Sequence, residues 1–160
     1  MSAVISPCGQ YRYRLERQCE GEGSTAIIMV NPSTADATED DATIRRLVGF
    51  GNRNKWGRLI VGNLFAYRAT DVRKLARITD PAGLPENDLH IMRMCRGADR
   101  VIVAWGPITK QPRYHRGRWR KVMDLIDQPV FSIGPVAKCG HPKHPLMLPY
   151  DSPILEWKTP

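Results

Sequence analysis

Residues 26–33 read Ala-Ile-Ile-Met-Val-Asn-Pro-Ser, an apolar run that ends abruptly in polar groups beside a proline. The run is long enough for one buried strand. Residues 131–145 have the same arrangement, because a short apolar segment leads into a proline-rich loop that contains Cys139, His141 and His144. Open α/β sheets bind ligands just beyond the carboxyl ends of their strands. We therefore expect these two distant loops to form two walls of one site.

The remaining apolar patterns predict strands that alternate with helices. Short apolar runs predict buried strands at residues 25–30, 58–65, 99–106 and 129–133. Helical spacing predicts helices that begin near Thr38, Pro85 and Trp119, and we expect Gly49 and Gly51 to end the first of them. This alternation implies right-handed crossovers, which place the carboxyl ends of the strands on one edge. The predicted fold is α/β, with three α/β/α layers and a four-stranded, mainly parallel sheet.

Length and composition suit a single domain, since the chain has 160 residues of which 42% are hydrophobic and 25% charged. We expect residues 1–24 to form an N-terminal edge hairpin and residues 134–160 to form a C-terminal loop and tail. No apolar run approaches the roughly 20 residues that span a bilayer. Residues 1–7 lack the basic start and long apolar region of a signal peptide. A cytoplasmic protein without a membrane partner is the expectation.

The four cysteines are widely scattered, and no two of them form a Cys-x-x-Cys pair. We expect reduced thiols in a cytosolic protein, with no cofactor and no bound metal. One alternative stays open, in which Asp36, Cys139, His141 and His144 form the metal site of a hydrolase.

The formal net charge of +8 is concentrated in two stretches of the chain. One cluster of basic residues lies in the stretch 45–58. A second cluster, in the stretch 110–121, includes no acidic residue. Such density favours a phosphate-rich partner, because each neutralised phosphate releases counterions. The alternative is a solvated basic surface. We predict a nucleic-acid or nucleotide partner whose phosphates contact Lys110, Arg113, Arg116, Arg118 and Arg120.

Two asparagines, Asn31 and Asn63, follow the first two predicted strands at equivalent positions. An amide there can donate and accept at once, so it could hold a water molecule or the edge of a heterocycle. For Asn31 the alternative is a turn, which Asn-Pro often begins. Further candidates for binding a substrate at this site are Pro32, Ser33, Asp36, Tyr67, Arg68 and Trp105.

The chemistry of these candidates suits a base and its phosphate. Tyr67 could stack on a base and Arg68 could hold a phosphate, whereas Trp105 could either stack or fill the core. His141 or His144 could donate to a developing anion or act as an acid or base. The sequence does not choose between the two histidines.

The order of these motifs resembles that of the uracil-DNA glycosylase superfamily. Residues 30–33 are similar to its Gly-Ile-Asn-Pro-Gly turn, and residues 62–68 resemble its Thr-Asn-Val-Val-Lys-Cys-Arg-Pro segment. Residues 101–106 are comparable to its third strand, which ends in Leu-Gly. Its last motif, His-Pro-Ser, is matched by His141-Pro142 or by His144-Pro145.

A likeness to a second family covers nearly the whole chain. Residues 31–36 and 140–146 resemble the signature Asn-Pro-Ser-Thr-Ala-Asp and Gly-His-Pro-Lys-His-Pro-Leu of a bacterial and phage family of unknown function. The superfamily resemblance implies that Asn31 positions an attacking water, that Asn63 recognises the base, and that a histidine stabilises the departing base. The expected function is base recognition, with hydrolysis of the N-glycosidic bond of a modified or mismatched base. The alternatives are a non-catalytic nucleic-acid-binding module and the metal-dependent hydrolase.

Overall fold

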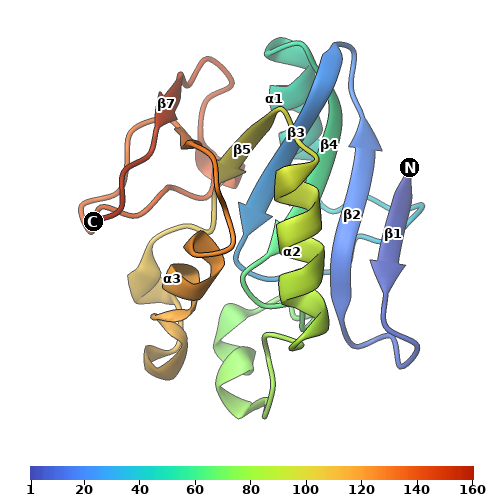
Figure 1. Ribbon diagram of the computed structural model, residues 1–160, viewed down its shortest axis with the longest axis vertical. Coiled ribbons are helices and arrows are strands. Elements are labelled where there is room, and N and C mark those ends of the chain that lie inside the picture. The colour runs from blue at the N-terminus through green and yellow to red at the C-terminus, as the bar shows by residue number, and fades with distance from the viewer.

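A computed structural model describes residues 1–160, in which seven strands form one sheet in the order β1-β2-β4-β3-β5-β6-β7 (Figure 1). The strands are β1 (Ser2–Ile5), β2 (Arg12–Gln18), β3 (Glu22–Met29), β4 (Trp56–Asn63), β5 (Arg100–Val103), β6 (Val130–Ile133) and β7 (Ile154–Glu156). The α-helices are α1 (Ala42–Arg53), α2 (Glu86–Arg96) and α3 (Arg118–Met123). Four short 3₁₀ helices complete the chain: η1 (Val72–Arg77), η2 (Ile108–Lys110), η3 (Arg113–His115) and η4 (Pro145–Met147).

The sheet mixes parallel and antiparallel pairing. Strand β3 pairs in parallel with β4 and β5, and β5 pairs in parallel with β6. The pairs β1–β2, β2–β4 and β6–β7 are antiparallel. The predicted α/β class is confirmed, but the sheet is wider than the four strands expected, because the N-terminal strands join β4 and the C-terminal tail adds β7.

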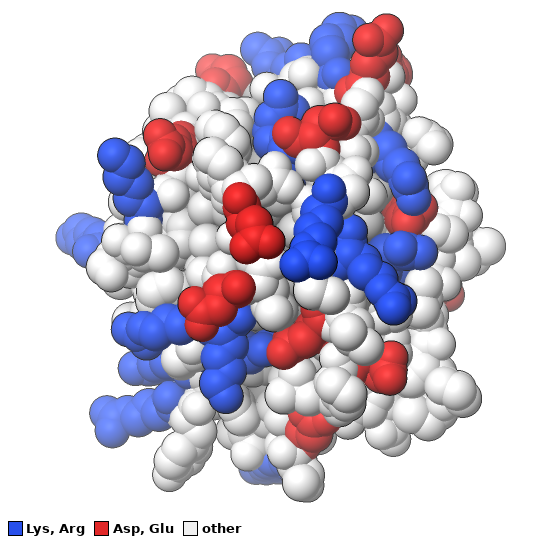
Figure 2. Space-filling model, in the orientation of Figure 1, with Lys and Arg blue, Asp and Glu red and all other residues white.

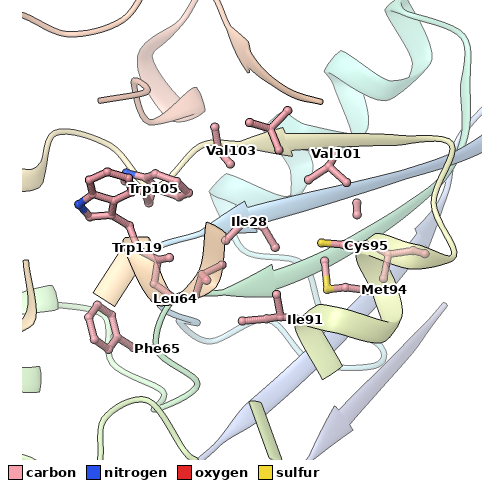
Figure 3. Close-up of a cluster of buried hydrophobic side chains, with 14 of the residues drawn as sticks. Ile28, Leu64, Phe65, Ile91, Met94, Cys95, Val101, Val103, Trp105 and Trp119 are labelled. Carbon is pink, nitrogen blue, oxygen red and sulfur yellow. The ribbon is translucent and has the colours of Figure 1, made fainter. Parts of the chain in front are cut away.

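Helices cover both faces of the sheet. Figure 1 shows α2 in front of the strands, α1 behind them and α3 at the lower left, and α3 shares a buried cluster with α2. On the α2 and α3 face, Ile91 and Met94 of α2 pack against Ile28 of β3, and Trp105 and Trp119 extend the same cluster (Figure 3). On the other face, α1 buries Ile44, Leu47 and Phe50 against strand residues. The two faces of β3 are buried by different helices, which explains why its sequence is apolar rather than alternating.

Two details of α1 differ from the prediction. The helix begins three residues later than Thr38 suggested, because Asp41 is its N-cap and accepts from the Ile44 backbone N–H at 2.9 Å. It also continues through Gly49 and Gly51 to Arg53, so the expectation that these glycines end it is wrong. A Cβ atom on Gly51 would lie 2.5 Å from Cys19 Sγ, and one on Gly49 would meet the Tyr150 ring. Both glycines therefore permit close packing within the helix.

None of the helices combines the length and the apolar character that crossing a membrane requires.

Candidate functional site

A cleft of about 680 Å³ lies at the carboxyl edge of the sheet. Its walls come from the segments after β3 and β5, the start of α1 and the segments that lead into η1 and η4. Polar and aromatic side chains in these walls include Asn31, Asp41, Trp105, Lys110, Gln111 and His144. We call this the edge cleft. It brings together residues of the two loops that the sequence places far apart.

Asn31 stabilises the first of these loops. Its Nδ2 donates to the Ala69 carbonyl at 2.6 Å and to the Pro32 carbonyl at 3.1 Å, which ties the loop after β3 to the segment before η1. The Oδ1 atom accepts no hydrogen bond from the chain. Asn31 therefore serves the turn and keeps one acceptor available in a cleft wall.

His144 is held in one tautomer by its own loop. As the N-cap of η4, its Nδ1 accepts from the Leu146 backbone N–H at 3.3 Å. A neutral imidazole that accepts at Nδ1 carries its proton on Nε2. Burial lowers the pKa of His144 below its ordinary value of 6.5, and Lys110 lowers it further while Asp41 opposes the shift. His144 is therefore a neutral donor at neutral pH.

Asp41 places a carboxylate in the same cleft. One of its oxygens, Oδ1, caps α1, and Oδ2 accepts no hydrogen bond from the chain. Asp41, Lys110 and His144 line the same cleft, and the two charges act in opposite directions on the pKa of His144. The edge cleft thus combines a carboxylate, an ammonium group and a neutral imidazole.

The other predicted histidine, His141, lies in an aromatic cluster rather than in the edge cleft. It is only 5% exposed, and its ring centroid lies 5.1 Å from that of Trp119 and 6.3 Å from that of Trp157. The Trp105 Nε1–H donates to His141 Nδ1 at 3.3 Å. Burial lowers the pKa of His141 below 6.5, since charging it would cost desolvation. Of the two histidines, only His144 lines the edge cleft.

Trp105 belongs both to the edge cleft and to the aromatic cluster around His141. It lines the edge cleft, yet it is 2% exposed and packs edge-on against Trp157, with ring centroids 5.3 Å apart. The sequence left stacking and core packing open, and the structure makes Trp105 a buried wall residue.

Gln111 is a cleft residue that sequence reasoning missed. It is 3% exposed, and neither its Oε1 nor its Nε2 has a hydrogen-bond partner in the chain. A buried amide without partners costs about 1–3 kcal/mol, so its place in a cleft wall points to a ligand. The only available signal was an uncharged polar residue inside a basic stretch.

Three residues predicted to bind the base or substrate lie outside both large clefts: Pro32, Asp36 and Asn63. Asn63 is 1% exposed with both amide atoms unpartnered. Since alternate residues of a strand share a face, it points to the α1 side with Val61. Asp36 accepts from the backbone N–H groups of Thr38 and Glu39 at 2.9 and 3.0 Å, and these bonds lower its pKa. Asp36 is accordingly committed to a turn.

A second cleft of about 760 Å³ adjoins the first and shares Ser33, Ala69 and Thr70 with it. Tyr67, Arg68, Lys74 and Arg77 line this second cleft, which we call the basic cleft. Arg68 donates to the backbone carbonyls of Ser33, Gly9 and Thr34 at 3.3–3.5 Å, so it also holds the wall together. Tyr67 and Arg68 therefore lie beside the edge cleft, on the far side of Ser33.

The basic residues of the stretch 110–121 differ in their exposure and in their contacts. Lys110 lines the edge cleft, and Arg113 and Arg120 are exposed. Arg116 donates to the backbone carbonyls of Gln111 and Thr109. Figure 2 shows basic side chains gathered over α3 and the segment before it, at the lower left of this face.

Arg118 corrects the prediction of a phosphate contact. Its side chain is buried, pairs with Asp88 and donates to the Leu64 carbonyl at 2.9 Å. The basic residues of the stretch 45–58 are partly structural in the same way. Arg46 stacks on the Tyr150 ring at 3.7 Å, and Arg58 pairs with Glu16 at 2.6 Å.

The residues of the metal-hydrolase alternative do not form a metal site. No three of the His, Cys, Asp and Glu side chains lie together in a group that could hold a metal ion.

Comparison with known proteins gives a family and no activity. The sequence model of a family described as "Protein of unknown function (DUF1643)" matches residues 12–146. No curated protein and no solved structure matches the chain.

Proposed function

This chain belongs to the DUF1643 family, and we propose that it binds a nucleobase in the edge cleft and hydrolyses the N-glycosidic bond of that base. The observation that carries the proposal is that His144 is neutral and has its proton on Nε2. A neutral imidazole with its proton on Nε2 lines a cleft together with the free acceptor of Asn31 and the carboxylate of Asp41. This set suits a reaction in which negative charge develops on a leaving base.

The reaction balances with these groups alone. Water attacks the anomeric carbon of the sugar. One O–H of this water donates a hydrogen bond to Asn31 Oδ1, and the other O–H gives its proton to the Asp41 carboxylate as the new C–O bond forms. The glycosidic C–N bond breaks, and its electron pair leaves with the base. His144 Nε2–H donates to the anionic base, a contribution of about 3 kcal/mol, or roughly a hundredfold in rate, for a single donor.

Base recognition falls to Gln111 in this proposal. Its amide offers the N–H donors of Nε2 and the acceptor Oε1, and both atoms are unpartnered. Both amide atoms are buried, so the side chain must turn toward the cleft before a base edge that accepts and donates can satisfy them. The superfamily resemblance assigns this role to Asn63, but Asn63 lies outside the edge cleft. The parallel run β4-β3-β5-β6 supports a glycosylase-like placement of the cleft.

The experiment is a screen of oligonucleotides that carry varied modified or mismatched bases, read by strand breakage at abasic sites. We expect an abasic product from the wild-type protein. His144→Asn retains an acceptor near the position of Nδ1 for the Leu146 N–H, and Asp41→Asn retains an N-cap, so each should lower turnover at least about a hundredfold without unfolding the protein. His90→Asn, a histidine outside the cleft, is the matched control and should retain activity.

One observation favours a second candidate, a binding module without turnover. The Asn31 Nδ2 atom is fully used by backbone carbonyls, as a purely structural residue would be. Oligonucleotide binding that survives in His144→Asn and Asp41→Asn, together with no abasic product from any substrate, would select this second candidate and reject the glycosylase.

A further inference from the structure

The basic cleft carries two cations on one face of a short helix. Lys74 and Arg77 are one turn apart in η1, and residues three apart are eclipsed in a 3₁₀ helix. Both are exposed and line the cleft, and neither forms an ion pair. The neighbouring Asp71 pairs with Arg73 at 2.7 Å. Two charges are therefore free at this wall.

No carboxylate lines the basic cleft to neutralise these cations. A third cation of the lining, Arg68, has its guanidinium fixed by the backbone carbonyls of Ser33, Gly9 and Thr34. Ser33, Thr34 and Thr70 add hydroxyl groups, which can donate to an anion. Such a combination of fixed and mobile cations with hydroxyl donors is suited to a phosphate.

The position of the basic cleft relates it to the edge cleft. Ser33, Ala69 and Thr70 belong to both linings, so a ligand in one cleft lies directly beside the other. Consecutive groups of one nucleotide chain could occupy both at once. By contrast, Arg113, Arg116, Arg118 and Arg120 line neither cleft.

We propose that the basic cleft binds a phosphate of a nucleotide chain whose neighbouring base occupies the edge cleft. Lys74 and Arg77 neutralise the phosphate, and the hydroxyl groups of the shared wall orient it. The proposal rests on the proposed function for the position of the base, and it makes the substrate an oligonucleotide rather than a free nucleoside. Phosphate binding itself is independent of turnover.

The test compares two double variants that remove the same charge. Lys74→Ala with Arg77→Ala empties the basic cleft of its free cations, and Lys138→Ala with Lys158→Ala removes two exposed lysines that line neither large cleft. Binding of a fluorescent single-stranded oligonucleotide is measured by anisotropy over a range of salt concentrations. The cleft variant should bind at least about tenfold more weakly, and its slope of log K against log salt should fall by about 0.7 for each phosphate that the protein no longer neutralises.

Other outcomes would overturn the proposal. It fails if the wild-type protein does not bind the oligonucleotide, if both double variants weaken binding equally, or if the salt slope of the cleft variant is unchanged. A further outcome is that inorganic phosphate displaces the oligonucleotide at concentrations as low as those at which the oligonucleotide itself binds. That result would assign the cleft to free phosphate and would also reject the proposal.

The glycosylase and the phosphate site fail separately. Cleft-dependent binding without any abasic product would reject the glycosylase and retain the phosphate site. Turnover by the wild-type protein, with unchanged affinity in the double variant of Lys74 and Arg77, would retain the glycosylase and reject the phosphate site.

Discussion

A single backbone contact decides which nitrogen of His144 carries the proton. The Leu146 N–H occupies Nδ1, so the donor is Nε2, and burial keeps the ring neutral. The sequence could place a histidine beside two prolines but could not choose between His141 and His144. The choice depends on the fold, because tryptophans from three distant segments enclose His141.

Three partly or fully buried histidines lead us to expect a loss of stability in acid. The pKa values of His90, His141 and His144 all lie below 6.5, mainly because of burial. Below pH 6.5 the unfolded chain therefore binds more protons than the folded one, so the free energy of unfolding falls as the pH falls. Their contribution is complete above pH 6.5 and is lost as the pH drops through the lowered folded values.

Urea unfolding at about pH 7.5 and about pH 5.5 measures this loss. His144→Asn keeps the acceptor for the Leu146 N–H and removes one titrating group, so the fall in stability should be smaller than in the wild type. An identical fall in both proteins would show that His144 titrates normally in the folded state.

Gln111 predicts a conflict between stability and binding. Gln111→Leu replaces an unpartnered buried amide with an apolar group of similar size. We expect the free energy of unfolding to rise by about 1 kcal/mol, because the desolvation cost of the amide disappears, while oligonucleotide affinity falls. Denaturant unfolding and anisotropy check the two effects on one sample. A destabilised variant with normal affinity would make Gln111 a structural residue.

At the scale of elements, α1 shows why helix boundaries were predicted less well than helix positions. Its apolar stripe places the helix, but the choice of cap depends on which acidic residue reaches a free N–H. Asp41 caps α1, whereas the Thr38 backbone N–H donates to Asp36. Glycine near a helix end usually marks a stop, and here it marks contacts with Cys19 and Tyr150 that no local pattern encodes.

We expect one added methyl group at Gly51 to lower the stability of the protein strongly. Gly51→Ala would place Cβ 2.5 Å from Cys19 Sγ and 3.3 Å from Cys19 Cβ, so the helix or the end of β2 must shift. Overpacking of this kind costs about 1–3 kcal/mol, which thermal unfolding would detect. Gly117→Ala is the control, because its nearest neighbour is an Arg120 side-chain atom at 4.0 Å and its backbone is right-handed helical. Equal effects of the two substitutions would contradict the packing argument.

Across the whole molecule, the predicted strands at residues 25–30, 58–65, 99–106 and 129–133 correspond to β3, β4, β5 and β6. The strand β7 was missed because it is short and surrounded by prolines. Among the site residues, Asn31, Trp105, Lys110 and His144 meet in the edge cleft. Gln111, Lys74 and Arg77 could not be foreseen, because burial and the approach of η1 to the loop after β3 are tertiary effects.

Trp157 predicts that the C-terminal tail stabilises the cleft from outside. It is 4% exposed, packs on Trp105 and Trp119, and donates from Nε1 to the Gly140 carbonyl at 3.0 Å. Trp157→Ala should lower the free energy of unfolding by about 3–5 kcal/mol, as denaturant unfolding would measure. It should also weaken ligand binding, since Trp105 loses its packing partner. Tyr114→Ala, at an exposed aromatic residue, should leave both quantities unchanged.

The position of Trp157 near the C-terminus determines which shortened forms of the chain can fold. Family similarity extends over residues 12–146, so a fragment cut at those limits would lack β1 at one edge of the sheet and β7 at the other. It would also expose the indole faces of Trp105 and Trp119 that Trp157 covers. Such a fragment should aggregate rather than behave as a smaller version of the protein. The stretch that the family model matches is therefore shorter than the sheet, whose two edge strands lie outside it.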